Sequence, residues 1–474
     1  MDSYGQFDEC VKKAAEFFKS IDKKEVIRLI SHLDADGISS CALAIKLLTH
    51  DNRKYSVSTV QQLNRQVIEG LAKESHNYIM FTDLGSSAVS DIQELMPNKK
   101  VIILDHHSVH GYVQSENIWM VNPHLFGIDG GKEISGAGVV FRFAIAADES
   151  MKDYAHIAII GAMGDLQDQG GFLKLNKEIL GIAVEKGKIE INRGLRIFGA
   201  QTRPLHKCLE YCTDPYIPGV SGTESGAIQF LCQIGIDPKN GSGWKKITQL
   251  NDEEMQKLVT GIIMKRLNEA KPEDVLGDIY ILPHEEEESP TRDAKEFATL
   301  LNACGRLGRA SFGIGACLGD KKIKQQAIRS LADYKKEIVS AMSWYNENKH
   351  GDDIFWGERF VIINAKDKIM STMIGTLASI LSKSGQMIQN VFILSMARNA
   401  EGMTKSSLRT TNNINGNLDL KKIVDEISSG IEKCECGGHM NAAGAVFPTA
   451  SESFFIETAK EVLGKYVVEE KIGA

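Results

Sequence analysis

Long hydrophobic runs are absent from this chain: no segment reaches ~18 consecutive apolar residues, the length that a membrane-spanning helix needs. Residues 1–20 have an amphipathic helical spacing and lack the continuous apolar stretch of a secretory signal peptide. We therefore expect a cytoplasmic protein without a membrane span. With 474 residues and a hydrophobic content of 43%, the chain can still bury sizeable cores, and its length indicates two or three domains.

Closely paired cysteines are also lacking. The nine cysteines are odd in number and scattered, and none belongs to a Cys-x-x-Cys pair, which favours reduced thiols over a disulfide framework. A zinc site that combines Cys208 and Cys212 with Cys434 and Cys436 is the alternative, but buried thiols are the commoner outcome for such spacing.

The chain has no excess of basic residues. Its 55 lysines and arginines are outnumbered by 62 aspartates and glutamates, and the net charge is −7. A protein with this balance does not attract polyanions through its overall charge. A polyanionic substrate would therefore need a local positive groove or bound cations.

Short apolar runs alternate with helix-like stretches in the first part of the chain. The runs at 25–30, 78–82 and 101–104 each lead into a polar, acid-containing turn, and the stretches at 38–49 and 86–96 have helical patterns. This alternation predicts an α/β fold with a mostly parallel sheet. The ligand site of such a sheet lies beyond the carboxyl ends of its strands.

A long helix is expected to separate this region from a second, smaller α/β domain. Residues 321–349 keep apolar side chains on one face over about eight turns, without glycine or proline. Beyond them the alternation of strand and helix patterns restarts. Helices are also expected at 135–147 and 153–162, before the loop GAMGD. The second domain is expected to contain strands at 359–364, 391–396 and 404–411 and helices at 372–383 and 420–429.

The turn SHLDADG follows the first predicted strand. In an extended segment alternate side chains share a face, so His32, Asp34 and Asp36 are expected to point to one place. For Asp36 alone, capping the N-terminus of the following helix is the more usual role. Three further loops at the same predicted sheet edge favour a shared site. They carry Asp83 in TDLGSS, His106 and His107 in LDHHS, and Asp165 in GAMGD.

This donor set suits two divalent cations. The four carboxylates would neutralise the four positive charges of the ions, and the histidines would complete the coordination shells. A mixture of carboxylate and imidazole favours Mn²⁺, with Mg²⁺ or Co²⁺ as substitutes, and zinc is less suited without thiolates. A His-His dipeptide alone is usually structural or exposed. In combination with the other three loops it predicts a metal centre.

In this order, HLDADG, TDLGSS, LDHH and GAMGD resemble the four motifs of the DHH phosphoesterase superfamily. Residues 134–144 and 301–308 resemble the RecJ-type single-strand exonucleases, while KSSLRTT and CGGHMNAAGA resemble the DHH-associated substrate-binding domain. Residues 193–220 resemble the archaeal RecJ-like branch, which accompanies the replisome complex GINS. The resemblance implies a catalytic domain at 1–190, an extension of the catalytic lobe at 191–320, a linking helix at 321–350 and a substrate-binding domain at 351–474.

The resemblance further implies which side chains act on the metals. Asp83 would bridge the two ions. Asp105 would orient a histidine, a role that metal sites commonly need, and His107 would contact the scissile phosphate. Asp168, three residues past Asp165, is expected to be a bystander. One ion would be held by His32, Asp34 and Asp83, and the other by Asp36, Asp83, His106 and Asp165.

The strand-binding residues are implied in the same way. Glycines let backbone N–H groups approach a phosphate closely, and an arginine fork binds phosphate bidentately. For CGGHMNAAGA alone, a tight helix-packing turn is the alternative. Aromatic residues form only 7% of the chain, so base stacking is expected to matter less than backbone contacts. The expected residues are Asn302, Arg306, Ser407, Arg409, Gly437, Gly438 and His439.

The function that the resemblance implies is a two-metal exonuclease of DNA replication or repair. It would degrade single-stranded DNA from the 5′ end, and RNA as a further candidate, and release mononucleotides, with GINS as a partner. Three alternatives stay open: a phosphodiesterase for very short oligonucleotides, a replisome scaffold, and an inorganic pyrophosphatase. The last is disfavoured because its motif spaces the first histidine and aspartates differently from HLDAD.

Overall fold

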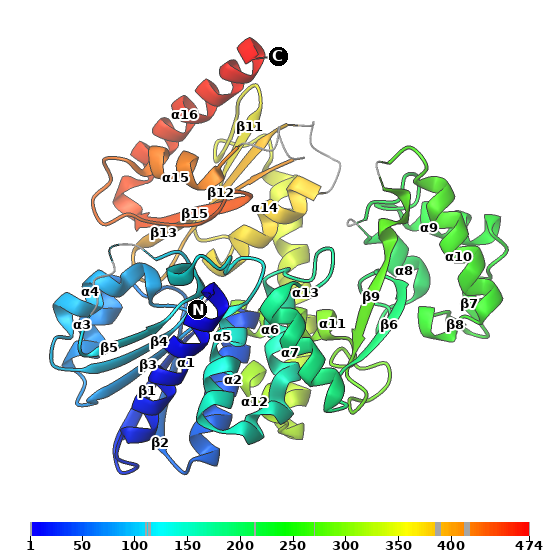
Figure 1. Cartoon of the computed structure of the whole chain (residues 1–474). Helices are drawn as coiled ribbons and strands as arrows, with labels where there is room; N and C mark the ends of the chain where they lie inside the picture. Colours follow the sequence, from blue (N-terminus) through cyan, green and yellow to red (C-terminus); the bar gives the residue numbers. More distant parts are fainter. Residues whose placement is uncertain are drawn as a thin grey trace. The chain divides into compact units, whose positions relative to one another are not determined.

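The computed structural model describes residues 2–109, 111, 115–212, 215–269, 271–383, 390–411 and 418–473. Two compact units divide the chain, Met1–Leu331 and Ala332–Ala474 (Figure 1). Each unit has its own main sheet and its own hydrophobic core. The protein is therefore a mixed α/β protein, as the alternation of sequence patterns predicts.

A five-stranded parallel sheet frames the first unit, with the strand order β2-β1-β3-β4-β5. Three of its strands, β1 (Val26–His32), β3 (Tyr78–Thr82) and β4 (Lys100–Leu104), coincide with the expected apolar runs. The other two, β2 (Lys54–Val60) and β5 (Ile118–Val121), were not expected. β2 is a polar strand at the sheet edge and β5 has only four residues, so neither has the long apolar pattern of a buried strand.

Alternate residues of the strands supply two cores on opposite faces of this sheet. In β4, Ile102 and Leu104 belong to the larger core, whereas Val101 and Ile103 belong to the smaller one. Figure 1 shows the helices of these cores on the two sides of the sheet. The larger core includes α1 (Ser3–Ser20), α2 (Ala35–His50), α5 (Gly136–Ala147), α6 (Ala155–Gly164), α7 (Lys174–Glu185), α11 (Ala294–Arg306) and α12 (Ala310–Leu318); the smaller includes α3 (Arg65–Lys73) and α4 (Val89–Leu95).

An inserted segment of the first unit forms a separate small core between α7 and α11. Its antiparallel strands β6 and β9 pair along their full lengths and frame a helical cluster. The core inside this cluster consists of aliphatic residues, Phe230 and two cysteines. The elements are β6 (Glu190–Leu195), α8 (Leu205–Glu210), α9 (Glu224–Gln233), β7 (Lys239–Asn240), β8 (Gly243–Trp244), α10 (Asp252–Lys265) and β9 (Leu276–Ile281).

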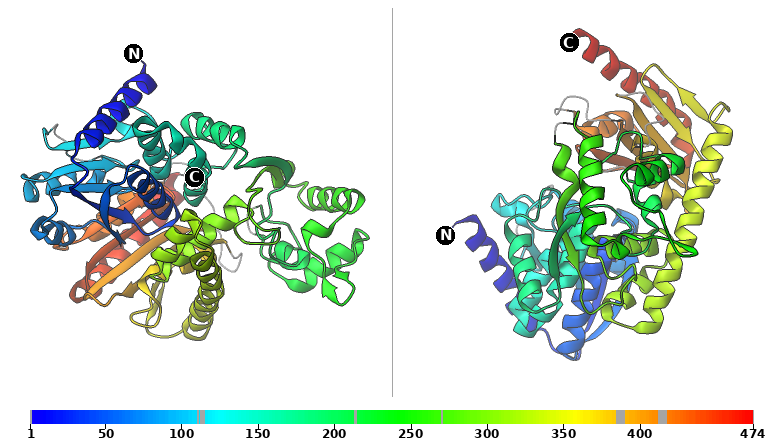
Figure 2. Two further views of the ribbon diagram at one scale, coloured as in Figure 1. Left: turned by 90° about the horizontal axis from the view of Figure 1, so that it is seen from below. Right: turned by 90° about the vertical axis from the view of Figure 1, so that its right-hand side faces the viewer.

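The expected long helix is present as α13 (Lys321–Asn348), a continuous helix of 28 residues that Figure 2 shows in yellow-green. The boundary between the two units, at Leu331 and Ala332, falls inside this helix. Among all described helices, none combines the length and the apolar character that crossing a membrane demands.

The second unit contains a six-stranded mixed sheet with the order β10-β11-β12-β13-β15-β14. Only β11 and β12 run parallel, and the other neighbours run antiparallel. The GGH motif ends β14 in a tight hairpin with β15, and the turn contacts the start of α15 because the carbonyl oxygen of Met440 accepts the N–H of Leu420 (3.0 Å). The elements are β10 (Ile354–Trp356), β11 (Phe360–Asn364), α14 (Ile374–Lys383), β12 (Phe392–Arg398), β13 (Met403–Thr410), α15 (Leu420–Ser428), β14 (Glu435–His439), β15 (Ala442–Pro448) and α16 (Glu452–Gly473).

Candidate metal centre

The residues predicted to bind metal meet in the first unit, where β1, β3 and β4 end. His32 is the last residue of β1, Asp83 directly follows β3, and His106 lies two residues past β4. Asp165 comes from the C-terminus of α6, which packs against α2. Their potential ligand atoms form three groups, each with all atoms within 4.8 Å of one another. The groups are His32, Asp34 and Asp83; Asp36, His106 and Asp165; and Asp83, His106 and His107.

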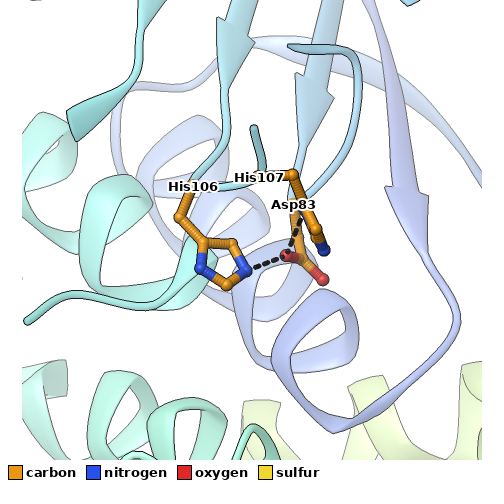
Figure 3. A group of neighbouring side chains, drawn as sticks. All are labelled: Asp83, His106 and His107. Atoms are coloured by element: carbon orange, nitrogen blue, oxygen red, sulfur yellow. Dashed lines mark ion pairs between the residues drawn. The ribbon is translucent and has the colours of Figure 1, made fainter. Parts of the chain in front are cut away.

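Asp83 belongs to two of these groups and presents a different oxygen to each. Its Oδ2 lies 3.4 Å from Nδ1 of His32, and its Oδ1 lies 3.3 Å from Nε2 of His106. Figure 3 shows the carboxylate between the rings of His106 and His107. The predicted bridging role of Asp83 therefore has a geometric basis in this arrangement.

The backbone of Asp83 is in the left-handed region, with a φ of 58°. A residue other than glycine costs about 1–2 kcal/mol in this conformation. The loop is held by a hydrogen bond from the Asp83 N–H to the carbonyl oxygen of Leu104 (2.9 Å). The side chain is 1% exposed, and neither oxygen has a hydrogen-bond partner among the described residues. A buried carboxylate without partners is unfavourable, and a bound cation would satisfy it.

The remaining ligand atoms surround the same space. Nδ1 of His32 lies 3.1 Å from Oδ2 of Asp34. Nε2 of His106 lies 3.6 Å from Oδ2 of Asp36 and 3.3 Å from Oδ2 of Asp165. Nδ1 of His32 and Nε2 of His106 are also buried without a hydrogen-bond partner among the described residues. Buried nitrogen and carboxylate oxygen atoms that face one another without hydrogen bonds fit a site for divalent cations.

Asp36 reaches the site from a helix and not from an extended segment. Helix α2 begins at Ala35, so the expectation that residues 32, 34 and 36 share a face through extended geometry is wrong. Asp34 is the N-cap and accepts a hydrogen bond from the Gly37 N–H (3.0 Å). Asp36 is not the cap; its carboxylate accepts hydrogen bonds from the N–H groups of Gly136 (2.6 Å) and Ala137 (3.0 Å) at the start of α5.

Two glycines that were not among the expected site residues make room for these carboxylates. A Cβ atom on Gly136 would lie 2.5 Å from Oδ1 of Asp83, and one on Gly161 would lie 2.5 Å from Oδ1 of Asp36. No side chain larger than hydrogen fits there without displacing a carboxylate. The sequence signals for this requirement are the segment ISGAGVVFRFA, which contains Gly136, and the motif GAMGD, which begins with Gly161.

Asp105 is placed to orient His107. Its Oδ1 lies 2.8 Å from Nδ1 of His107 and accepts the N–H of His106 (2.8 Å), while its Oδ2 accepts the N–H of Ser86 (2.9 Å). Burial alone would raise the pKa of Asp105, but the charge and hydrogen bond of His107 hold it well below its usual range. Asp105 is therefore a fixed anion that holds the ring of His107.

The ring of His106 is oriented by a backbone oxygen that sequence reasoning did not identify. Its Nδ1 lies 2.7 Å from the carbonyl oxygen of Gly130, which leaves Nε2 directed at the carboxylates. Gln167 donates to the same carbonyl oxygen (2.9 Å) and accepts from Asn176 (2.6 Å). A fixed second nitrogen of this kind is common for histidines that bind metal.

The electrostatics of the site show a shortage of positive charge. Burial and the neighbouring charge of Asp83 raise the pKa of Asp36 to about 7. Burial and the charge of Asp36 also raise the pKa of Asp165. Although burial opposes it, the surrounding carboxylates raise the pKa values of His32 and His106. These four groups hold protons more tightly than usual, as expected where cations would otherwise neutralise the carboxylates. Asp34 differs: although burial opposes it, the charge and hydrogen bond of His32 lower its pKa.

The two expected strand-binding residues of the first unit lie on α11. Asn302 contacts the metal-site loop: its Oδ1 accepts a hydrogen bond from the N–H of Ala35 (3.0 Å), at the start of α2. Arg306 is the last residue of α11 and is partly buried. Asn302 therefore positions the backbone between Asp34 and Asp36, a role that the sequence did not indicate.

The expected strand-binding residues of the second unit lie around β13 and β14. Nη1 of Arg409 donates to Oγ of Ser407 (3.0 Å) and to the carbonyl oxygen of Leu408 (2.8 Å), and its Nε donates to Oγ of Ser379 (3.2 Å). Gly437 and Gly438 lie on β14, with Gly438 at a φ of 124°. The side chain of His439 is outside the described part of the structure.

Asp168 and the cysteines stay outside the three ligand groups of the described residues. Asp168 lies 3.8 Å from Nη2 of Arg196 and 3.8 Å from Nζ of Lys295, which links α11 to the inserted segment. Cys208 and Cys212 are buried in the core of that segment. The groups therefore offer no support for a zinc site built on thiolates.

Comparison with known proteins assigns the class. The DHH family, N-terminal domain, matches residues 26–162; the DHH-CID domain matches residues 197–279; and the DHHA1 domain matches residues 358–465. The chain is 31% identical over 471 residues to the uncharacterized protein MJ0831 of Methanocaldococcus jannaschii, and this alignment covers 96% of this chain and 99% of that protein. The chain belongs to the DHH superfamily.

Solved structures show the same fold. RecJ from Thermus thermophilus in complex with Mn²⁺ has a TM-score of 0.58 and 16% identity, covering 96% of this chain and 55% of that one. The chain thus spans about half the length of that RecJ. CDC45 from Entamoeba histolytica has a TM-score of 0.63 and 12% identity, covering 98% of this chain and 99% of that one. Together with the family, this fold supports a phosphoesterase or a nuclease.

Proposed function

We propose that this protein is a metal-dependent exonuclease that degrades single-stranded DNA from its 5′ end, and RNA as a second substrate, releasing mononucleotides. The observation that carries the proposal is Asp83, whose two buried oxygens face two separate groups of potential ligands. Mn²⁺ is the proposed ion, with Mg²⁺ or Co²⁺ as substitutes, because the donors are carboxylates and imidazoles. The proposed ligands are His32, Asp34, Asp36, Asp83, His106 and Asp165.

The side chains of the site would divide the work of phosphodiester hydrolysis. When bound, a pair of divalent ions supplies a hydroxide nucleophile at neutral pH and neutralises charge on the phosphoryl oxygens. His107 is the most exposed of the clustered histidines, with 39% of its side chain accessible, and Asp105 holds its ring. We therefore assign to His107 the contact with the scissile phosphate. Asp105 would act by holding His107 in a fixed orientation.

The substrate strand would be held by polar groups of both units. Arg409 presents a guanidinium fixed by Ser379 and Ser407, and an arginine fork suits the phosphate backbone of a nucleic acid. Arg306 would contribute a second positive charge from the first unit. Under this proposal residues 1–190 are the catalytic domain, 191–320 its extension, 321–350 the linker and 351–474 the substrate-binding domain. Asn302, Ser407, Gly437, Gly438 and His439 complete the proposed strand-binding set.

Product analysis tests this proposal directly. Single strands of DNA and RNA, each labelled at the 5′ or the 3′ end, are incubated with the full chain and Mn²⁺. We expect immediate release of labelled mononucleotide from 5′-labelled DNA and gradual shortening of 3′-labelled DNA. The Asp83→Ala variant should lose at least roughly 100-fold in kcat/KM, because it removes a ligand proposed to serve both ions. Glu149→Ala, which removes an exposed acid from the short helical turn before α6, is the matched control and should keep full activity.

Two other outcomes would replace the proposal. A strong preference for a 2-mer over a 40-mer would indicate a phosphodiesterase for very short oligonucleotides. An absence of Mn²⁺-stimulated hydrolysis, with no difference between Asp83→Ala and the original chain, would indicate a replisome scaffold. The resemblance of residues 193–220 to a GINS-associated branch favours a partner role for GINS in either case. Hydrolysis of pyrophosphate without hydrolysis of DNA would indicate an inorganic pyrophosphatase.

A further inference from the structure

A cavity lined mainly by polar residues lies in the first unit, at the opposite end of α6 from the metal centre. Its volume is about 200 Å³, and it is lined by His156, Lys188, Leu282, His284 and Glu285. His156 is the second residue of α6, whereas Asp165 directly follows the last. The nine-residue separation corresponds to roughly 14 Å along the helix. The cavity is therefore distinct from the metal centre.

Positive charge is concentrated around this cavity. Burial, followed by the charges of Lys188, Lys46, His284 and Lys324, lowers the pKa of His156 to about 4. In the described part of the chain, the side-chain ammonium of Lys188 forms no hydrogen bond or ion pair. The charge of Lys188 acts on Asp153, but Asp153 is paired with Lys186 at 2.9 Å. The cavity thus has a lysine whose charge is not neutralised by an ion pair.

Lys46 adds a second charge of this kind. Its Nζ donates to the carbonyl oxygen of Leu318 (3.0 Å) and lies 4.8 Å from the centre of the Tyr154 ring. Neither partner carries a negative charge, and no carboxylate among the described residues pairs with Lys46. Two lysines that act on His156, Lys188 and Lys46, are therefore without a carboxylate partner among the described residues, although the whole chain carries a net charge of −7.

The one carboxylate that lines the cavity is already engaged. Both oxygens of Glu285 accept hydrogen bonds from Nζ of Lys324, at 2.6 and 2.8 Å, and the hydroxyl of Thr291 donates to Oε2. A metal cation would find no available anion there. Nδ1 of His156, in contrast, is buried without a hydrogen-bond partner among the described residues. A buried polar atom of this kind is unfavourable unless a ligand or a water satisfies it.

We propose that this cavity binds a phosphoryl oxyanion, either inorganic phosphate or the 5′-phosphate of a mononucleotide. His156 would donate a hydrogen bond from Nδ1 to an oxygen of the anion, and Lys188 would supply the charge-assisted contact. Lys46 and Lys324 would add attraction at longer range. If the proposed nuclease activity holds, its mononucleotide product is one source of this group, but binding itself does not depend on that activity.

Equilibrium dialysis of the full chain tests the site. The probes are radiolabelled phosphate and 5′-dAMP, with deoxyadenosine as the control without a phosphate, all in EDTA and at constant ionic strength. We expect one phosphate bound per chain, no binding of deoxyadenosine, and binding weakened roughly five-fold or more by Lys188→Gln, since one nearby charge is lost. Lys177→Gln, which removes an exposed lysine of α7 outside the lining, is the matched control and should bind as the original chain does.

The comparison of the two probes identifies the source of the phosphoryl group. Tighter binding of 5′-dAMP than of phosphate indicates the mononucleotide, and the reverse order indicates the free anion. Equal binding by the original chain and Lys188→Gln, or no saturable binding of either probe, would overturn the proposal. Because Lys188 is partly exposed, its substitution is expected to leave folding intact, which thermal unfolding of the same samples checks. None of these measurements uses nuclease activity, so they succeed or fail independently of the proposed function.

Discussion

At Asp83, three unfavourable features occur together: a left-handed backbone, nearly complete burial, and a carboxylate without hydrogen bonds among the described residues. Each costs free energy in the metal-free chain. The carboxylates of Asp36 and Asp165 lie close by and repel one another. Burial and this repulsion raise the pKa values of both groups. A bound cation would offset these unfavourable terms, because it would neutralise the carboxylate and occupy its free oxygens. The features of Asp83 therefore agree with the proposed metal centre.

Asn302 provides a prediction at the residue scale. If it positions the metal-site loop, Asn302→Ala leaves the N–H of Ala35 without its partner and should lower the free energy of unfolding by about 1–2 kcal/mol. Mn²⁺ affinity should fall roughly ten-fold, as for other residues that orient metal ligands. Calorimetric titration with Mn²⁺ measures this change, and Asn302→Asp, which keeps an acceptor oxygen, should restore most of the stability. An unchanged Mn²⁺ affinity with a raised KM for DNA would instead support the expected strand-binding role.

Leu166 provides a second prediction at this scale. It directly follows Asp165 at the C-terminus of α6 and has a φ of 59°. Its N–H donates to the carbonyl oxygen of Met163, and the N–H of Gln167 donates to the carbonyl oxygen of Ala162. Glycine is the usual residue at this position, and the leucine is 51% exposed. Leu166→Gly should therefore raise the free energy of unfolding by about 1 kcal/mol.

Thermal unfolding measures the effect of Leu166→Gly, and Asn52→Gly is its matched control. Asn52 occupies the same position after α2, with a φ of 52°. Its N–H donates to the carbonyl oxygen of Thr49, and the N–H of Arg53 donates to the carbonyl oxygen of Leu48. Asparagine tolerates this conformation, so the control should change little. A loss of stability in Leu166→Gly would show that the contacts of the leucine side chain stabilise the chain by more than its backbone strain costs. A gain in stability with a loss of activity would show that the strain serves the site.

At the scale of elements, α11 is packed directly against the turn that carries the first metal ligands. A Cβ atom on Gly305 would lie 1.7 Å from the carbonyl oxygen of Leu33. Gly305→Ala must therefore move α11 or the HLDAD turn, and we expect a loss of about 1–3 kcal/mol in the free energy of unfolding. Chemical denaturation measures this loss, and Mn²⁺ titration of the same protein should show weaker binding.

The matched control for this change is Gly181→Ala in α7. Gly181 is exposed in a helix, and no atom lies within 4 Å of the position of its Cβ. Replacing it with alanine should stabilise the chain by up to about 1 kcal/mol, because alanine is the better helix former. Equal effects of the two substitutions would show that α11 does not depend on close contact with the turn.

At the scale of the whole molecule, the two units have separate cores, so thermal unfolding should occur in two transitions. All proposed metal ligands lie in Met1–Leu331. Mn²⁺ at 100 times its Kd should therefore stabilise one transition by about 2.7 kcal/mol for each of the two proposed ions and leave the other unchanged. Differential scanning calorimetry with Mn²⁺ and with EDTA measures both transitions. A single transition, or an equal shift of both, would mean that the units unfold cooperatively.

The strands that the sequence identified are those buried on both faces, because β3 and β4 then appear as continuous apolar runs. The polar edge strand β2 and the short strand β5 lack this signal and depend on pairing with their neighbours. The start of α2 was misjudged for a related reason. HLDADG was interpreted as extended, whereas the Asp34 cap and the contacts of Asp36 with α5 begin the helix at Ala35.

By itself, the sequence determined which acids and histidines could form the site and that the strand ends would present them, because these follow from local patterns and ordered motifs. The expected assignment of Asp83 to two ions came from the resemblance. Only the tertiary structure decided how its two oxygens are directed and which carbonyl orients His106. It alone also showed that Asn302 accepts a hydrogen bond from Ala35, 267 residues away in the sequence. These contacts join segments that are distant in the chain, and no local pattern specifies them.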